Sequence, residues 1–269
     1  MSGATKILVI GSGGREHSLV WKLRQSPRAG EIYCAPGNGG IAEDAECLPV
    51  DVKNLDSMVA LATRLQPDLT VIGPELPLML GVVDEFTRRG WRTFGPTQAA
   101  AQLETSKSFA KEFLQRHRIP TAHYAICNST DEIRDALPHF HPPIVVKADG
   151  LAAGKGVILC DSHNIALEAA HCLFNGSLLG ESSQQVVIEE FLEGEEISFI
   201  CLSDGTHVAP LAPAQDHKRI GEYDTGPNTG GMGVYSTDSM LEPQMTDWIM
   251  RHIAEPTIRG IAEEGTPFV

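Results

Sequence analysis

Lysines and glycines that could bind a phosphate group are concentrated in one stretch, KADGLAAGKGV at residues 147–157. Its spacing is not that of a P-loop, because three residues instead of four separate Gly150 from Gly154, and Lys155 is followed by Gly156. Apolar runs on both sides, PPIVVK and GVILC, predict a β-hairpin connection instead of a strand-to-helix loop. The backbone N–H groups of such a hairpin can close over a polyphosphate, whereas a flexible linker is the alternative interpretation.

Charged side chains also end the two apolar strands nearest to this loop. Lys147 closes the run IVVK, a position that predicts an inward-pointing ammonium group. The strand QQVVIEE leads into a possible hinge whose backbone groups could meet an adenine edge: Glu189, Glu190, Phe191 and Leu192. Three more acids follow, and one of them could meet a ribose: Glu193, Glu195 and Glu196. A dense acidic run is also typical of a solvated turn, but we expect a buried strand on each side of this one.

A second possible anion site lies near the amino terminus, where the apolar run KILVI ends in the sequence GSGGREH. It carries three glycines, Gly11, Gly13 and Gly14. The third glycine of a dinucleotide fingerprint is replaced by Glu16, and no acidic residue ends the second strand, so a dinucleotide is disfavoured. The N-terminus of the following helix favours a small anion such as a monophosphate, with Arg15 and His17 nearby. A tight turn without a ligand is the alternative.

A long, polar, glycine-rich segment at residues 203–235 begins with an Asp-Gly hairpin signal and shows no other obvious regular structure. A connection of this length is usually functional or disordered. It contains several chemically competent side chains: Asp216, His217, Lys218, Arg219 and Asn228. His217 could be a metal ligand or a base, but no second His or Cys stands at ligand spacing, which favours a hydrogen-bonding role.

Alternating strands and helices must position the anion site near the amino terminus. Apolar strands separated by helical stretches imply a parallel sheet that is buried on both faces. The strands are expected at residues 6–10, 31–38, 68–75 and 91–97. The last three end in PGN, GPE and GPT, at the strand ends where open α/β sheets bind ligands.

The pattern changes at about residue 105, so the fold class predicted is an N-terminal α/β domain followed by an α+β domain. The periodicity predicts a helix closed by Pro120, two strand pairs, a second helix and a final amphipathic helix that covers the core. These three helices are expected at residues 105–120, 164–174 and 248–265. We expect domains at 1–104 and 105–269, with a smaller lid-type subdomain at 120–190.

Composition excludes several classes of function for the 269 residues. A net charge of −14 argues against a general nucleic-acid surface, although local cations can still bind an anionic metabolite. Six scattered cysteines without a CxxC pair argue for a reducing compartment and against a zinc site. No apolar run is long enough for a signal peptide or a membrane span, so we expect a cytoplasmic protein without a membrane partner.

The motifs in order resemble one known family along essentially the whole chain. They read GSGGREH, APGN, GPE, FGPT, SKSFAKEF, VVKADGLAAGKGV, VIEEFLEGEE, AQDHKR and GPNTGGMG. The set is similar to phosphoribosylamine–glycine ligase, a member of the ATP-grasp superfamily. The resemblance implies a Rossmann-like domain preceding an ATP-grasp domain. It also implies ligation of glycine to 5-phosphoribosylamine in purine synthesis, with ATP and Mg²⁺ (or Mn²⁺) as cofactors and an acyl phosphate intermediate.

The resemblance also assigns roles to residues of this sequence. It implies catalytic roles for Lys147, Asp216 and Lys218. The nucleotide would be bound by Lys107, Lys147, Gly154, Lys155, Gly156, Glu189, Glu190, Phe191, Leu192 and Glu196. The side facing phosphoribosylamine would include Gly11, Gly13, Gly14, Arg15, Gly37, Asn38, Pro74, Glu75 and Asn228.

The resemblance leaves the metal without ligands in this sequence. In the family, GTPFV leads into further strands with an EFN-type motif whose Glu and Asn bind Mg²⁺, and the sequence stops at Val269. No metal ligand is therefore assigned within 1–269, and the chain is expected to be a fragment or a shortened product that is inactive alone. Its remaining ATP-grasp domain would be incomplete.

Two other functions stay open at this point. One is a different ATP-grasp carboxylate–amine ligase, which an assay of amine acceptors would distinguish. The other is a non-catalytic nucleotide-binding module, which titration with ATP with and without Mg²⁺ would distinguish.

Overall fold

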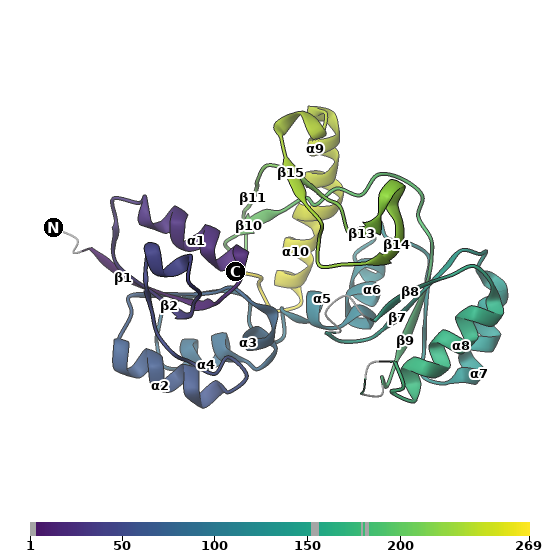
Figure 1. The fold of residues 1–269 in the computed structure, drawn as a ribbon, viewed down its shortest axis with the longest axis horizontal. Helices are drawn as coiled ribbons and strands as arrows, with labels where there is room; N and C mark the ends of the chain where they lie inside the picture. The colour runs from purple at the N-terminus through teal and green to yellow at the C-terminus, as the bar shows by residue number, and fades with distance from the viewer. Residues whose placement is uncertain (1–3, 152–155, 179, 181–182) are drawn as a thin grey trace. The chain divides into compact units, whose positions relative to one another are not determined.

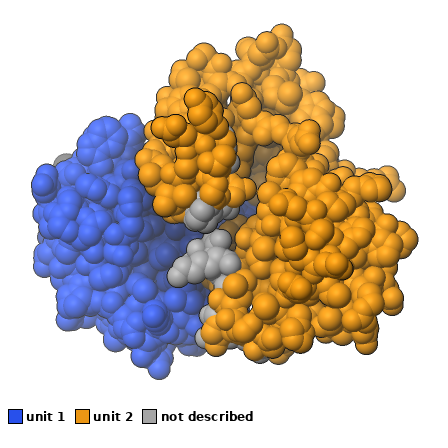
Figure 2. Space-filling view, turned by 45° about the vertical axis from the view of Figure 1, so that its right-hand side comes forward, with its two compact units in different colours: residues 1–102, 261–269 blue, residues 103–260 orange. Residues whose placement is uncertain are grey.

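The computed structural model describes residues 4–151, 156–178, 180 and 183–269. The chain forms two compact units, coloured separately in Figure 2: unit 1 comprises Met1–Gln102 and Ile261–Val269, and unit 2 comprises Leu103–Gly260. The expected boundary at 104/105 lies two residues beyond Gln102. The last nine residues belong to unit 1, although the sequence suggested that they continue the second domain.

Unit 1 contains a five-stranded parallel sheet in the order β3-β2-β1-β4-β5. Figure 1 labels two of its strands, β1 and β2. Its strands are β1 (Thr5–Gly11), β2 (Ala29–Pro36), β3 (Glu46–Cys47), β4 (Leu69–Ile72) and β5 (Thr93–Phe94). Leu8 and Ile10 pack on one face with α2 (Leu55–Leu65) and α4 (Val82–Arg88). Ile7 and Val9 pack on the other face with α1 (Gly14–Arg24). The predicted parallel sheet is thus confirmed, and burial on both faces explains why the central strand is apolar from Ile7 to Ile10.

The three predicted strands after the first were too long at their carboxyl ends. β2 ends at Pro36, β4 at Ile72 and β5 at Phe94, so the PGN, GPE and GPT motifs lie mainly in the turns that follow. Gly37 and Gly95 have positive φ angles of 70° and 151°, which end the extended conformation. After β4 the chain enters the short helix α3 (Glu75–Met79).

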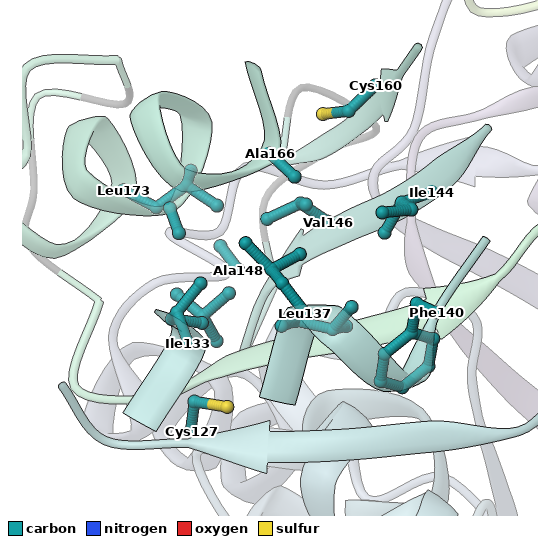
Figure 3. Packing of buried hydrophobic residues seen from close by; sticks show 13 residues of the cluster. Cys127, Ile133, Leu137, Phe140, Ile144, Val146, Ala148, Cys160, Ala166 and Leu173 are labelled. Atoms are coloured by element: carbon teal, nitrogen blue, oxygen red, sulfur yellow. The ribbon is translucent and has the colours of Figure 1, made fainter. Parts of the chain in front are cut away.

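Unit 2 contains a four-stranded sheet in the order β6-β9-β7-β8, in which every neighbouring pair is antiparallel. Its strands are β6 (Tyr124–Cys127), β7 (Ile144–Ala148), β8 (Val157–Cys160) and β9 (Val186–Glu190). The helices α7 (Thr130–Ala136) and α8 (His163–Phe174) supply Ile133 and Leu173 to the core on one face of this sheet (Figure 3). The predicted α+β character of this part is confirmed, as is the antiparallel pairing of the strands that flank the lysine loop.

The helix predicted at 105–120 is divided and shorter. α5 (Gln102–Thr105) is separated from α6 (Lys107–Arg116) by Ser106, whose hydroxyl accepts a hydrogen bond from Phe109 N as the N-cap of α6. The helix ends four residues before Pro120, because Arg118 takes a left-handed φ of 55°. Pro120 therefore follows the end of the helix and does not cause it.

The segment expected to lack regular structure contains three short antiparallel ladders. They pair β10 (Cys201–Ser203) with β11 (Val208–Pro210), β12 (Ala214–Asp216) with β15 (Val234–Ser236), and β13 (Arg219–Gly221) with β14 (Thr225–Asn228). The first ladder confirms the Asp-Gly hairpin. The prediction that a buried strand follows the acidic run was wrong, because β10 starts only at Cys201 and Leu202 is 47% exposed.

The final helix is longer than predicted and contains a change of helix type. α9 (Pro243–Ile249) continues through a π-helical turn at Met250–Ala254 into α10 (Glu255–Glu263). Ile258 and Ile261 are buried, which agrees with a helix that packs on a core. Within the described part of the chain, no helix is both long enough and apolar enough to span a membrane.

Candidate functional site

The strands β7 and β9 carry the charged centre of unit 2 on one face. Ile144, Val146 and Ala148 of β7 are buried in the core with α7 and α8, so the alternate residue Lys147 lies on the opposite face. β9 follows the same alternation and places Glu189 on that face. Lys147 Nζ lies 2.9 Å from Glu189 Oε1, with the lysine side chain 25% exposed. The predicted inward orientation of Lys147 is therefore correct, and a carboxylate is its partner.

A second lysine binds the same carboxylate from α6. Lys111 Nζ lies 2.9 Å from Glu189 Oε2 and donates to Thr121 Oγ1 at 2.8 Å. Lys111 is 9% exposed and Glu189 5%, so both charges are held away from water. Lys111 stands in the SKSFAKEF motif but was given no role from the sequence, because its partner is 78 positions away and no local pattern marks the contact.

Lys107, at the first turn of α6, lies beside this centre. Its ammonium group donates to the backbone carbonyl of Gly150 at 2.7 Å. Burial lowers the pKa of Lys107, Asp149 opposes that shift, and the charge of Lys147 lowers the pKa further. Lys107 of α6 and Lys147 of β7, from distant parts of the sequence, therefore both lie beside the start of the lysine loop.

Asp149 joins the start of the lysine loop to the N-terminus of α6. Its carboxylate accepts hydrogen bonds from Ser108 N at 3.1 Å, from Ser108 Oγ at 2.9 Å and from Ser106 Oγ at 3.2 Å. The sequence reasoning missed this role. The only available signal was that an acid directly follows a buried strand and that two serines begin a helix elsewhere in the chain.

A polar cavity of about 400 Å³ lies next to this region. It is lined by Asn128, Asp149, Gly150, Ser183, Gln184 and Gln185. Gly154 and Lys155, predicted to contact the nucleotide, lie outside the described residues. Gly156 is described, and its carbonyl accepts a hydrogen bond from Ala148 N at 2.8 Å, which closes the hairpin.

The predicted hinge after β9 is divided in its exposure. Glu189 is 5% exposed, whereas Glu190 is exposed and Phe191 and Leu192 are 40% and 64% exposed. Glu190 Oε1 accepts a hydrogen bond from His123 N at 2.7 Å. Glu196, predicted to meet the ribose, forms an ion pair with Lys218. Exposed apolar side chains beside backbone groups could meet a flat ring, and the adenine and ribose contacts of this segment stay predictions.

The other residues predicted in the long segment occupy the short ladders. Asp216 pairs with Val234 in the β12–β15 ladder, and Asn228 pairs with Arg219 in the β13–β14 ladder. The ring of His217 stacks on Tyr235 with centroids 5.8 Å apart, which supports the simpler structural interpretation of this histidine. The catalytic roles of Asp216 and Lys218 remain predictions.

Unit 1 gathers its predicted residues at the carboxyl ends of β1, β2 and β4. Asn38 Nδ2 donates to Ser12 O at 2.8 Å, and Gly37 N donates to Gly11 O at 3.0 Å, so the loops after β1 and β2 are joined. Arg15 Nη1 lies 2.8 Å from Glu75 Oε1, next to Pro74, the N-cap of α3. The hydrogen bond with Glu75 is the main cause that raises the pKa of Arg15, and it also lowers the pKa of Glu75.

One carboxylate of the chain already occupies the glycine loop. Glu16 is 3% exposed, and its Oε2 accepts hydrogen bonds from Ser12 N at 3.1 Å and Gly13 N at 2.6 Å. The other oxygen accepts from Arg15 Nε at 3.0 Å. The N–H group of Gly13 is thus bound to Glu16, and the predicted substrate contact of Gly13 stays a prediction. Gly14 and Arg15 remain exposed at the start of α1.

Among the described residues, no group of three or more His, Cys, Asp or Glu side chains is arranged to hold a metal ion. The acids nearest to the lysines, Glu189 and Asp149, already accept hydrogen bonds from Lys147, Lys111, Ser106 and Ser108. No Mg²⁺ ligand is assigned to them.

A Rossmann-like parallel sheet followed by an antiparallel sheet with convergent lysines is the arrangement of an ATP-grasp protein. Residues 5–104 match the model of the phosphoribosylglycinamide synthetase N domain, and residues 105–269 match that of its ATP-grasp (A) domain. The chain belongs to the phosphoribosylglycinamide synthetase family. The resemblance inferred from the motifs is thus confirmed.

Curated relatives agree with this family. The chain is 54% identical over 265 residues to the phosphoribosylamine–glycine ligase of Xanthomonas campestris, covering 98% of this chain and 62% of the relative. It is 51% identical over 266 residues to that of Xylella fastidiosa, again covering 98% of this chain and 62% of the relative. The chain therefore spans a little under two thirds of the length of these relatives.

Solved structures share the fold. The crystal structure of phosphoribosylamine–glycine ligase from Thermotoga maritima matches with a TM-score of 0.83 and 32% identity over 97% of this chain and 62% of that one. The biotin carboxylase domain of Hydrogenobacter thermophilus 2-oxoglutarate carboxylase, in complex with MgADP, matches with a TM-score of 0.73 over 96% and 59% of the two chains. At 16% identity the latter similarity concerns the fold alone.

Proposed function

We propose that the protein ligates glycine to 5-phosphoribosylamine at the expense of ATP, giving glycinamide ribonucleotide, ADP and phosphate. One observation carries the proposal: Lys107 and Lys147, from separate elements, both reach the start of the lysine loop, where Lys107 Nζ donates to Gly150 O at 2.7 Å and Lys147 Nζ lies 2.9 Å from Glu189 Oε1. A polyphosphate is an anion that suits two ammonium groups beside one loop.

The two units would bind different substrates of this reaction. In unit 2, Lys107 and Lys147 would bind ATP phosphates and offset negative charge as the terminal phosphoryl group moves to the glycine carboxylate. The exposed hinge residues Phe191 and Leu192 would bind adenine, and Glu196 the ribose. In unit 1, the exposed positions Gly14 and Arg15 would bind the phosphate of phosphoribosylamine. The amine would then displace phosphate from the glycyl phosphate.

Mg²⁺ belongs to this proposal as a property of the family. When bound, it would neutralise charge on the phosphates. No Mg²⁺ ligand is proposed among residues 1–269. The six free cysteines and the net charge of −14 support a cytoplasmic protein without a nucleic-acid partner.

The proposal is tested by ADP release in two forms of the protein. One is the 269-residue chain; the other joins it to the part of the Xanthomonas campestris relative outside the match. ADP release by the joined protein should require both glycine and 5-phosphoribosylamine, and Lys147→Ala should abolish it. Faster turnover with another carboxylate or amine would point to a different ATP-grasp ligase, and ATP binding without any turnover to a nucleotide-binding module.

A further inference from the structure

Lys111 is the most deeply held cation of the charged centre, and the proposed chemistry does not use it. Its side chain is 11% exposed, whereas that of Lys147 is 25% exposed. Glu189 and Thr121 accept from its ammonium group, which also lies 5.6 Å from the centroid of the Tyr124 ring. Lysine is rarely buried unless its charge is paired, so the groups around Lys111 stabilise its protonated form.

The three charged groups do not cancel. One carboxylate, Glu189, lies between two ammonium groups, each with an N–O distance of 2.9 Å. The trio therefore carries one excess positive charge. Because Lys147 is the most exposed of the three, the excess is presented to solvent at Lys147.

We propose that Lys111 is a positioning residue of the nucleotide site. It holds one oxygen of Glu189, so that the other oxygen fixes Lys147 on its strand without neutralising it. The inference rests on the proposed function, since Lys147 is assigned to the ATP phosphates there. The inference adds to the nucleotide site a residue that touches no substrate. It also explains why α6 carries Lys111 in addition to Lys107.

Removal of the Lys111 charge should change the net charge of the trio. Without it, Lys147 and Glu189 become a simple pair with no net charge, and Glu189 Oε2 loses its ammonium partner in a buried position. The attraction for an anion falls even though Lys147 itself is intact. Removal of both charges, at Lys111 and at Glu189, leaves Lys147 alone with the same net charge as the original trio.

The test measures binding of ATP and of inorganic tripolyphosphate, which carries charge but no adenine, by titration calorimetry at low ionic strength. Lys111→Met should weaken tripolyphosphate binding by about tenfold, because one unit of positive charge beside the bound anion is lost. Lys111→Arg should keep most of the affinity. The double variant Lys111→Met/Glu189→Gln should recover tripolyphosphate binding relative to Lys111→Met. Arg134→Met is the matched control, because it removes one positive charge from an exposed side chain of the same unit.

The outcomes separate this inference from the proposed function. If Lys111→Met is folded by circular dichroism and binds tripolyphosphate like wild type, the positioning role is overturned while the nucleotide site stands. Equal losses in the single and double variants would also overturn it, because they would mean that Lys111 only stabilises the fold. If Lys111→Met does not fold, weak tripolyphosphate binding by a folded double variant would likewise overturn the positioning role. Wild-type protein that binds neither probe would overturn both ideas.

Discussion

At the scale of single residues, the Glu16 side chain determines what the glycine-rich turn after β1 can bind. A glycine at its position would leave the N–H groups of Ser12 and Gly13 free for a phosphate, whereas here its carboxylate binds both. Its side chain packs against the α-carbons of Gly11 and Gly73, where an added Cβ would collide with it. These two glycines are therefore required by a neighbouring acid and not by a dinucleotide.

The first prediction follows from this occupation. Wild-type protein should not bind NADH, because a pyrophosphate would have to displace the buried Glu16 carboxylate from two backbone donors. Fluorescence titration with NADH, with a phosphoribosyl ligand as the comparison, measures this directly. Saturable NADH binding that NAD⁺ displaces would contradict the assignment of the loop.

The second prediction concerns Lys147. Lys147→Ala should weaken ATP binding by about 1.5–3 kcal/mol, the usual size of a hydrogen bond between charged partners. Calorimetry on folded protein measures the loss, and Lys53→Ala, at an exposed position of unit 1, is the control that should not change it. Unchanged ATP affinity in the Lys147 variant would remove this lysine from the site.

The third prediction uses the pKa of Lys107, which burial lowers from 10.5. As pH rises, Lys107 loses its proton before an ordinary lysine does, so ATP affinity should fall at pH values below 10.5. Stability should change in the opposite direction, because the unfolded state binds more protons between the two pKa values and the folded state then gains stability. Calorimetric titrations and thermal unfolding between about pH 7 and pH 10 test both trends. Lys107→Met should remove both trends, and a fall in ATP affinity that persists in that variant would assign the titration to another group.

At the scale of elements, the N-cap of α6 has two functions. Ser106 accepts from Phe109 N and donates to Asp149, which connects the helix to the start of the lysine loop. The N-cap of α8, Ser162, accepts from Ile165 N in the same way. The two caps therefore form a matched pair.

The fourth prediction compares them. Ser106→Ala and Ser162→Ala should each lower the free energy of unfolding by about 0.5–2 kcal/mol. Only Ser106→Ala should also weaken ATP binding, because Asp149 loses one of its donors beside Gly150 and Lys107. Urea unfolding and calorimetry measure the two effects. Equal ATP affinity in both variants would mean that the Asp149 contacts stabilise the helix alone.

The sequence predicted those elements whose signal is local. β1, β7 and α8 were found because an apolar run or a 3.6-residue period is visible within one window. The three-residue strands β12 and β15 were not found, because each is shorter than any periodic pattern and their pairing is decided by residues about 20 positions apart.

The candidate site divides in the same way. Roles for Lys107 and Lys147 were predicted from the family resemblance of their motifs and remain predictions. Lys111 and Asp149 stand in the same motifs, but their contacts depend on partners far along the chain. Propensity and spacing describe neighbours in sequence, so they cannot identify such contacts.

At the scale of the whole molecule, Ile261 is the first residue after the chain returns to unit 1, and it is fully buried. The fifth prediction is that Ile261→Ala lowers the free energy of unfolding by about 2–5 kcal/mol, through lost burial and the cavity left behind. Ile165→Ala is the matched control, because Ile165 is 47% exposed on α8.

Tryptophan fluorescence can assign the loss to unit 1. Trp91 packs edge-on against Phe86 with centroids 5.1 Å apart, and Trp21→Phe and Trp248→Phe remove the other two emitters. Urea unfolding monitored at Trp91 should shift in the Ile261 variant and not in the Ile165 variant. An unchanged Trp91 transition would mean that the return segment does not stabilise unit 1.

The return of the chain at Ile261 also sets the order in which the two segments of unit 1 leave the ribosome. A ribosome delivers Met1–Gln102 first, then Leu103–Gly260, and only afterwards Ile261–Val269, which belongs to unit 1 again. At typical elongation rates the interval is on the order of ten seconds. For that time the nascent first unit lacks its last segment, and the surface that Ile261–Val269 later covers stays available to chaperones. Leu103–Gly260, by contrast, is continuous in sequence, so its contacts can form while the first segment of unit 1 still waits for Ile261–Val269.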